Sequence, residues 1–365
     1  MRSVAAAWVV LALALALAAP AHAQGKAPQP ATRTRAEVDA LIDKVGKTPP
    51  DWWGKAKPNF PKSLDLSWPE PAPPGPWDPN KNVGQFIWSV INENPSRWPE
   101  GPKFVTHIMT VNKDDARVVN RAMNAMAVMY HNLHEDWARA AFWWRKAGNT
   151  EDNLDLADCY WKLGCREMAE EILNRYPSDG TRQCSVSKLW SDLGETEKAI
   201  ALAEEAAVQQ GRPDIGYLMA GEACRHSGRF DEALVYYQKV LDAANGTRDM
   251  DRNKIRAKAS LEAVCLFEAF DVKKVRPGKY KAESMGYEAP IDVEVTVGAG
   301  RIAKVEVTQH KEKQFYSALT DTPRRIIEKQ SVRGVDATTG ATITSEAIIN
   351  ATAKALAPRQ PAKKK

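Results

Sequence analysis

A glycine followed five residues later by an alanine recurs along the middle of this 365-residue chain. The pairs are Gly164/Ala169, Gly194/Ala199 and Gly228/Ala233, and an earlier stretch places Glu135 five residues before Ala140. The four anchor positions follow one another at intervals of 29, 30 and 34 residues. A glycine suits the turn between two helices, and an alanine lets the second helix approach the first closely. This period predicts stacked helical hairpins over residues 104–270.

The repeated stretches resemble the tetratricopeptide repeat, whose unit has about 34 residues. The last copy fits best, with Gly221, Gly228, Phe230, Ala233, Tyr237 and Val240 at consensus-like positions. Asp251 to Phe270 is expected to form a final helix that caps the stack. Stacked hairpins leave a concave face that commonly docks a peptide or a protein. A rigid spacer without a ligand is the alternative, and the charge pattern does not choose between the two.

The N-terminus carries one basic residue, Arg2, followed by an apolar run from Val4 to Ala19 and the small-residue triplet Ala21-His22-Ala23. The apolar run is shorter than the roughly 20 residues of a membrane span. This order is typical of a secretory signal. It predicts a signal peptide over residues 1–23 and a mature protein that begins at Gln24. An uncleaved membrane anchor is the alternative.

We therefore expect an exported protein, periplasmic or at the cell surface, that is soluble after cleavage of its signal. Export argues against a nucleic-acid partner. The basic residues at the far end, 359–365, are expected to form a solvated, disordered tail.

Residues 24–103 are rich in proline and tryptophan. Proline at this density disfavours long helices and predicts an extended segment. Its tryptophans are expected to pack against the helical repeats, because a free linker is poor in aromatic residues. A short helix is expected over Gly84–Glu93.

Cysteine and histidine suggest no metal or redox pair. The five cysteines contain no Cys-x-x-Cys, and we expect one disulfide, between Cys165 and Cys184. His131 and His134 are spaced as metal ligands can be, but no third ligand stands beside them, so structural roles are expected.

After residue 275 the pattern changes to a period of two, which predicts strands. Residues 279–286 form a first strand, and residues 290–310 a hairpin that turns at Gly298-Ala299-Gly300. That turn reads as a dinucleotide motif, but a strand follows it instead of a helix, so we reject that reading. A helix starting at Thr322-Pro323 and an amphipathic helix over residues 344–357 complete a small α+β domain, 275–358.

The segment Asp336-Ala337-Thr338-Thr339-Gly340-Ala341-Thr342 immediately precedes the last helix. Backbone amides and the positive end of the helix dipole favour an anion at such a place. The glycine lets the backbone turn tightly and approach a ligand. A plain Thr or Ser cap on the helix is the alternative.

With the strand pair and the helices around it, this segment resembles the FMN-binding domain found in the C subunit of sodium-translocating NADH:quinone reductases and the G subunit of Rnf complexes. The family's motif is Asp-x-x-Ser/Thr-Gly-Ala-Thr, and every specified position matches. The resemblance implies that Thr342 carries FMN through a phosphoester, installed from FAD by a flavin transferase that recognises Asp336. Further cofactor-binding residues implied by it are Thr339, Gly340, Ala341, Thr344, Ser345, Gly286 and Tyr287.

The sequence thus predicts a multidomain, exported electron-transfer flavoprotein in which the repeats position redox partner proteins. No catalytic or second cofactor motif accompanies the flavin, so we expect an electron carrier rather than a complete enzyme. Two alternatives stay open: an FMN-dependent reductase of a small molecule, and a repeat scaffold in which FMN is structural or regulatory.

Overall fold

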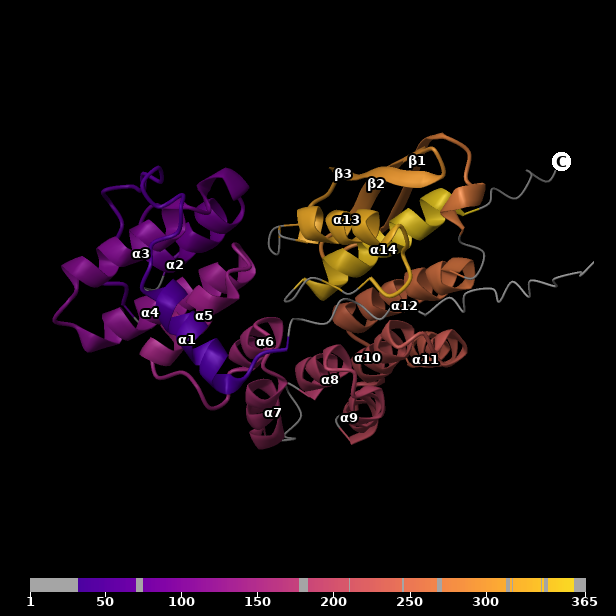
Figure 1. The fold of residues 1–365 in the computed structure, drawn as a ribbon, viewed down its shortest axis with the longest axis horizontal. Coiled ribbons are helices and arrows are strands. Elements are labelled where there is room, and N and C mark those ends of the chain that lie inside the picture. Colours follow the sequence, from indigo (N-terminus) through magenta and orange to yellow (C-terminus); the bar gives the residue numbers. More distant parts are fainter. Residues whose placement is uncertain are drawn as a thin grey trace, which may run out of the picture.

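The computed structural model describes residues 32–69, 75–176, 183–209, 211–244, 246–267, 271–312, 316, 318–335, 337 and 341–357, with Thr342 described by its backbone only. The chain is mainly helical as far as Phe267, and a small sheet with two helices follows (Figure 1). The predicted fold class, helical repeats followed by an α+β domain, is confirmed. Among the described helices, none combines the length and the apolar composition that a membrane span requires.

The repeats are four helical hairpins, and the anchor positions found in the sequence form their turns. The hairpins are α4 (Ala116–Asn132) with α5 (Trp137–Lys146), α6 (Leu154–Lys162) with α7 (Arg166–Arg175), α8 (Gln183–Asp192) with α9 (Thr196–Gln209), and α10 (Pro213–His226) with α11 (Phe230–Asp242). The three anchor glycines have φ angles between +80° and +97°. The four alanines five residues on are fully buried. The final helix is α12 (Arg248–Phe267).

Glu135 stands at the glycine position of the first hairpin turn and adopts a φ of +49°. This left-handed conformation costs a non-glycine residue about 1–2 kcal/mol. In addition, its Oε1 is buried without a hydrogen-bond partner among the described residues. Burial, then the charge of Asp321, raises the pKa of Glu135 above its usual value. The first repeat turn therefore carries strain that the other turns avoid.

We expect Glu135→Gly to raise the free energy of unfolding by about 1 kcal/mol, because it removes both the strained backbone and the buried carboxylate oxygen that lacks a hydrogen-bond partner in the described part of the chain. Chemical denaturation of the full chain measures this. The matched control is Gly228→Ala, whose Cβ would meet no atom within 4 Å at a φ of +80°. That variant should lose about 1 kcal/mol through backbone conformation alone. A loss of stability in Glu135→Gly would mean that the carboxylate stabilises the turn.

The proline- and tryptophan-rich segment is more helical than predicted. It contains α1 (Arg35–Gly46), α2 (Val83–Phe86), a π-helix (Ile87–Asn92) and a 3-10 helix (Pro95–Arg97), and α3 (Glu100–Val111) follows. The extended prediction is wrong over α1, because no proline occurs between Pro30 and Pro49 and Thr34 caps the helix. Helix α1 packs against α5. The short helix predicted over Gly84–Glu93 is confirmed.

Several tryptophans of this segment pack on the helices, as predicted. The Trp52 ring stacks on His134 with 4.9 Å between ring centroids, and Trp68 is buried beneath Arg121, whose Cζ lies 4.5 Å from its ring centroid. Trp77 and Trp88, in contrast, are exposed.

The predicted disulfide is wrong, since all five cysteines are free. His131 is buried, with Nε2 3.2 Å from Asp158 Oδ2.

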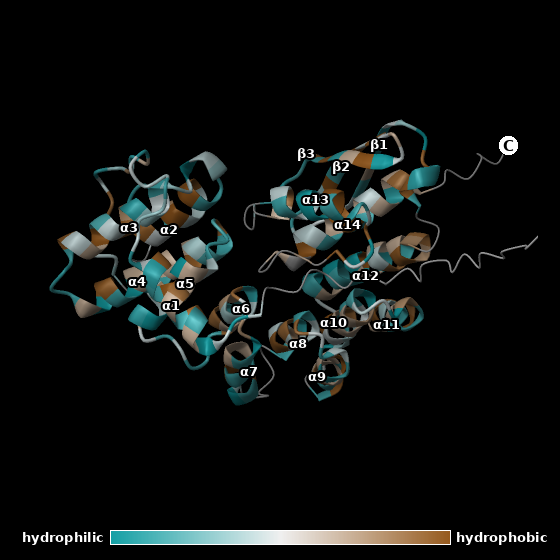
Figure 2. Cartoon of the chain, in the orientation of Figure 1, coloured by the Kyte–Doolittle hydropathy of each residue, from teal (hydrophilic) through white to brown (hydrophobic). Residues whose placement is uncertain are grey.

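The C-terminal domain has a sheet ordered β1 (Gly278–Met285), β2 (Pro290–Gly298), β3 (Arg301–Gln309), antiparallel throughout. A 3-10 helix, Val272–Lys274, precedes it. The turn between β2 and β3 is the predicted one, with positive φ angles at Ala299 and Gly300. In Figure 2, β2 carries hydrophobic residues and α13 (Ala318–Lys329) mainly hydrophilic ones.

Helix α13 starts at Ala318, four residues before the predicted Thr322-Pro323. The buried side chains Ala318, Thr322 and Ile326 explain this, since they form one stripe at helical spacing. The proline is therefore inside the helix.

The last helix, α14 (Thr342–Leu356), was predicted to be amphipathic. That prediction is wrong, because the helix is buried on both sides. It packs against β1 and β2 on one side and against α12 on the other. Its polar residues Glu346 and Asn350 therefore contact the repeats instead of water. Figure 1 shows α14 between the sheet and α12.

Candidate functional site

Helix α14 begins at Thr342, the last residue of the motif that the sequence singled out. The residue before it, Ala341, is buried and occupies the N-cap position, where its methyl side chain offers no oxygen to cap the helix. The amide of Ser345 donates to the Ala341 carbonyl at 2.9 Å, which closes the first turn. Asp336, Thr338, Thr339 and Gly340 lie outside the described residues.

The two hydroxyls that follow in α14 bind other parts of the domain. Thr344 donates to Glu312 Oε2 at 2.7 Å, and Ser345 accepts from the hydroxyl of Thr322 in α13 at 3.0 Å. Both side chains are buried. These bonds hold the start of α14 against the segment after β3 and against α13. Neither hydroxyl caps the helix.

Glu312 connects the start of α14 to the turn between β1 and β2. Its Oε1 accepts from the amides of Tyr287 at 2.9 Å and Glu288 at 3.2 Å, while Oε2 accepts from Thr344. The side chain is only 4% exposed. A buried carboxylate with three donors is well compensated, and it fixes the relative position of the groups that donate to it.

Gly286 is needed for this arrangement. A Cβ on it would lie 2.6 Å from Glu312 Oε1 and 2.8 Å from Ile291 Cδ1, both closer than real contacts allow. Its own amide donates to the Ala289 carbonyl at 3.0 Å and closes the turn. The predicted site residues Gly286, Tyr287 and Thr344 are therefore brought together through Glu312.

The repeats also contribute to this region. Arg252, near the start of α12, lies over the ring of Tyr287 with 5.8 Å between its Cζ and the ring centroid. One turn further along α12, Arg256 donates to Glu346 of α14 at 3.2 Å. Two cations of the last repeat helix thus lie beside the turn and the helix that form the candidate site.

The geometry fits the phosphate of FMN. The first turn of α14 presents backbone amides that the side chain of the N-cap residue Ala341 cannot cap, and the dipole of a 15-residue helix is positive at that end. Such an end binds a phosphate without further charged ligands. The cap reading of Thr344 and Ser345 loses its support, because their hydroxyls bond to Glu312 and Thr322.

Sequence reasoning missed Glu312, Arg252 and Glu346. Glu312 stands between two lysines in a charged loop, where it is indistinguishable from a solvated residue. Glu346 lies on the polar face of a helix predicted to be amphipathic, and such a face is expected to be exposed to solvent. Only the packing of α14 between the sheet and α12 gives these residues their roles.

Comparison with known families gives two matches in this chain. Residues 286–357 match the FMN-binding domain, and residues 216–247 match a tetratricopeptide repeat. Comparison with curated proteins gave no match for the chain. The first match begins at the glycine of the β1–β2 turn and ends just after α14, so it includes Gly286, Tyr287, Glu312 and Thr344 but not the arginines of α12. The protein therefore carries an FMN-binding domain behind tetratricopeptide repeats, and its cofactor is FMN.

Proposed function

We propose that this protein is an exported electron-transfer flavoprotein with FMN joined covalently to Thr342. The observation that carries the proposal is the complete attachment motif ending at the first residue of α14, where the N-cap residue Ala341 has no side-chain oxygen that could cap the helix. In the attachment step, the Thr342 oxygen forms a bond to the FMN phosphorus of FAD. The pyrophosphate bond breaks, AMP leaves, and the hydroxyl proton passes to solvent. A flavin transferase catalyses this step.

Bound FMN supplies the capacity to accept and donate electrons. The residues of this chain hold and orient it. Glu312 fixes the β1–β2 turn against the start of α14, and the amides of that helix favour the phosphate. Arg252 places a positive charge beside Tyr287. The repeats offer the surface on which redox partner proteins dock.

A small cavity lies between the repeats and the flavin domain. It is lined by residues of α8, α10 and α14, by Phe267 of α12, and by residues between Val332 and Ala337, and its volume is about 30 Å³. That volume is room for one or two water molecules. The choice between a carrier and a small-molecule reductase therefore rests on experiment.

The test is to produce the full chain, with its signal, in cells that do or do not contain an exported flavin transferase. With the transferase, the protein band in a denaturing gel should fluoresce, because a phosphoester survives unfolding. Without it the band should be dark. A dark band despite an active transferase would overturn covalent attachment. Mass analysis of the same material should give Gln24 as the first residue, and a retained Met1 would mean a membrane anchor.

The carrier role has its own test. The flavin-loaded protein is reduced and mixed either with proteins that co-purify with it or with small-molecule acceptors. Rapid reoxidation by a co-purifying protein alone supports a carrier, and turnover of a small molecule supports a reductase. If neither a co-purifying protein nor a small molecule reoxidises the reduced flavin, the flavin is structural or regulatory.

A further inference from the structure

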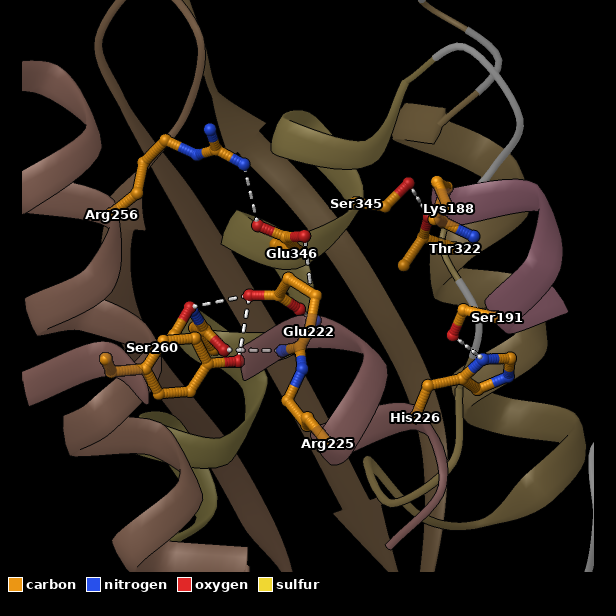
Figure 3. A network of polar contacts seen from close by, with 12 residues as sticks. Lys188, Ser191, Glu222, Arg225, His226, Arg256, Ser260, Thr322, Ser345 and Glu346 are labelled. Atoms are coloured by element: carbon orange, nitrogen blue, oxygen red, sulfur yellow. Dashed lines mark hydrogen bonds and ion pairs between the residues drawn. The ribbon is translucent and has the colours of Figure 1, made fainter. Parts of the chain in front are cut away.

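The interface between the repeats and the flavin domain contains a buried carboxylate, Glu346, four residues after Thr342 in α14 (Figure 3). Its Oε2 accepts from Arg256 Nη2 at 3.2 Å. Its Oε1 lies 3.8 Å from Arg225 Nη2 and has no hydrogen-bond partner among the described residues. A buried oxygen left in this state is costly, so it points to a role that the ion pairs alone do not explain.

Charged groups face Glu346 from two helices, α10 and α12. Helix α10 contributes Glu222 and Arg225, which form an ion pair with each other, and α12 contributes Arg256. Glu222 also accepts from the hydroxyl of Tyr237 in α11 at 2.9 Å and from Ser260 in α12 at 3.4 Å. Glu222 therefore has an ion-pair partner and two hydrogen-bond donors. Glu346, in contrast, has one hydrogen bond within the described ranges, from Arg256, and a longer contact with Arg225.

The cavity of about 30 Å³ lies against Glu346 and leads toward the surface. Lys188, Ser191 and His226 also line it, and the His226 side chain is 23% exposed, with Nδ1 3.3 Å from Ser191 Oγ and 3.9 Å from Asp192 Oδ1. On the flavin-domain side the lining includes Val335 and Ala337, the neighbours of Asp336. A cavity of this size with polar lining residues has room for water. Water in it would lie between Glu346 and the partly exposed imidazole of His226.

We propose that Glu346 is a proton-binding site linked to reduction of the flavin, reached through the water cavity from His226. This inference rests on the proposed function, since it needs FMN near the start of α14. When FMN accepts two electrons from a protein donor and one proton from solvent, it becomes the anionic reduced flavin. The Glu346 carboxylate then takes up a second proton and becomes a carboxylic acid, so that the buried charge does not rise.

Two physical arguments support the coupling. Burial, followed by the negative charge of Glu222, raises the pKa of Glu346 to about 7, against the opposing effect of Arg256 and Arg225. The acid is thus poised between its two states near neutral pH. Helix geometry places it about 6 Å along α14 from Thr342. If the reduced flavin placed a negative charge about 10 Å from Glu346, at an effective dielectric constant near 20, proton binding would strengthen roughly tenfold.

The test is the pH dependence of the flavin midpoint potential in the loaded full-length protein, measured between pH 5.5 and 8.5. For tenfold stronger proton binding in the reduced state, the wild-type potential should fall over this range by about 30 mV more than that of Glu346→Gln. At alkaline pH the Gln variant should have the higher potential, because it lacks the charge that disfavours reduction. The control is Glu262→Gln, which neutralises an acid at the other end of the interface, paired with Lys354. The midpoint potential of Glu262→Gln should show the same pH dependence as that of the wild type.

Parallel pH dependence in wild type and Glu346→Gln would overturn the inference. If Glu346→Gln folds poorly, an infrared difference spectrum of the oxidised and reduced protein tests the inference instead. Reduction of the wild type should then produce the band of a protonated carboxylic acid, and Glu222→Gln should move its appearance to lower pH. If the purified protein carries no flavin, the proposed function is wrong, whatever the role of Glu346. The absence of visible flavin absorption identifies that case.

A flavin-free readout uses Thr342→Ala. The folded pKa of Glu346 lies above its unfolded value, so the native state binds more protons between pH 4.5 and 7. This group therefore makes stability fall as pH rises through that window. Adding Glu346→Gln should flatten the fall. An unchanged pH profile would show that Glu346 keeps its charge in the folded protein.

Discussion

Thr342→Ala should abolish the fluorescence of the denatured protein band, because no oxygen remains at this position to be esterified. Free flavin bound to the folded site would be released on unfolding, so a covalent bond alone gives a signal in the gel. Thr342→Ser keeps a hydroxyl and should retain part of the signal. The measurement is in-gel fluorescence normalised to protein, with the flavin transferase present throughout.

Neighbouring residues provide the controls for this experiment. Thr344→Ala removes one hydrogen bond to Glu312 but not the acceptor, and Thr338→Ala likewise leaves Thr342 in place. Both should keep most of the attached flavin. Asp336→Ala should lower attachment if the transferase reads this acid. Fluorescence that persists in Thr342→Ala would move the attachment to another residue.

Glu312→Ala should destabilise the flavin domain by about 1–3 kcal/mol and reduce the yield of attached flavin. The change leaves the buried Thr344 hydroxyl without its acceptor, at a cost of about 1–3 kcal/mol, and it exposes the part-buried amides of Tyr287 and Glu288 to water. Glu312→Gln keeps one carbonyl oxygen for the two amides and should lose less. Chemical denaturation gives the stability, and the gel gives the attachment.

Glu288→Gln is the matched control, since it neutralises an exposed acid in the same turn. Its stability should stay within about 0.5 kcal/mol of the wild type. If Glu312→Ala were as stable as this control, the carboxylate would not be what holds the turn against α14.

Much of the fold was predictable because its signals are local. The Gly–Ala pairs located the hairpin turns, and even Glu135 was correctly aligned with the anchor glycines, although its backbone conformation costs energy there. Alternation of apolar residues predicted β2 and its turn. Helix α1 was missed because the composition of a long segment concealed a short stretch without proline.

The candidate site was only partly predictable, for a physical reason. The motif that ends at Thr342 is continuous in sequence, so a resemblance could find it. The roles of Glu312, Arg252 and Glu346 depend on contacts between residues far apart in the chain, such as Arg256 with Glu346. Periodicity describes one helix at a time and cannot say what covers its second face.

The burial of α14 on both faces has a consequence for the choice of partner. A flavin domain on a flexible tether can turn from one protein to another and serve several in succession. Here the helix that begins at Thr342 is joined to the repeats by Arg256–Glu346, by Ser260–Asn350 and by Glu262–Lys354. If a partner protein docks on the repeats as proposed, these contacts would present the flavin to it at one distance and in one orientation. This architecture favours a dedicated partner over a pool of exchangeable ones.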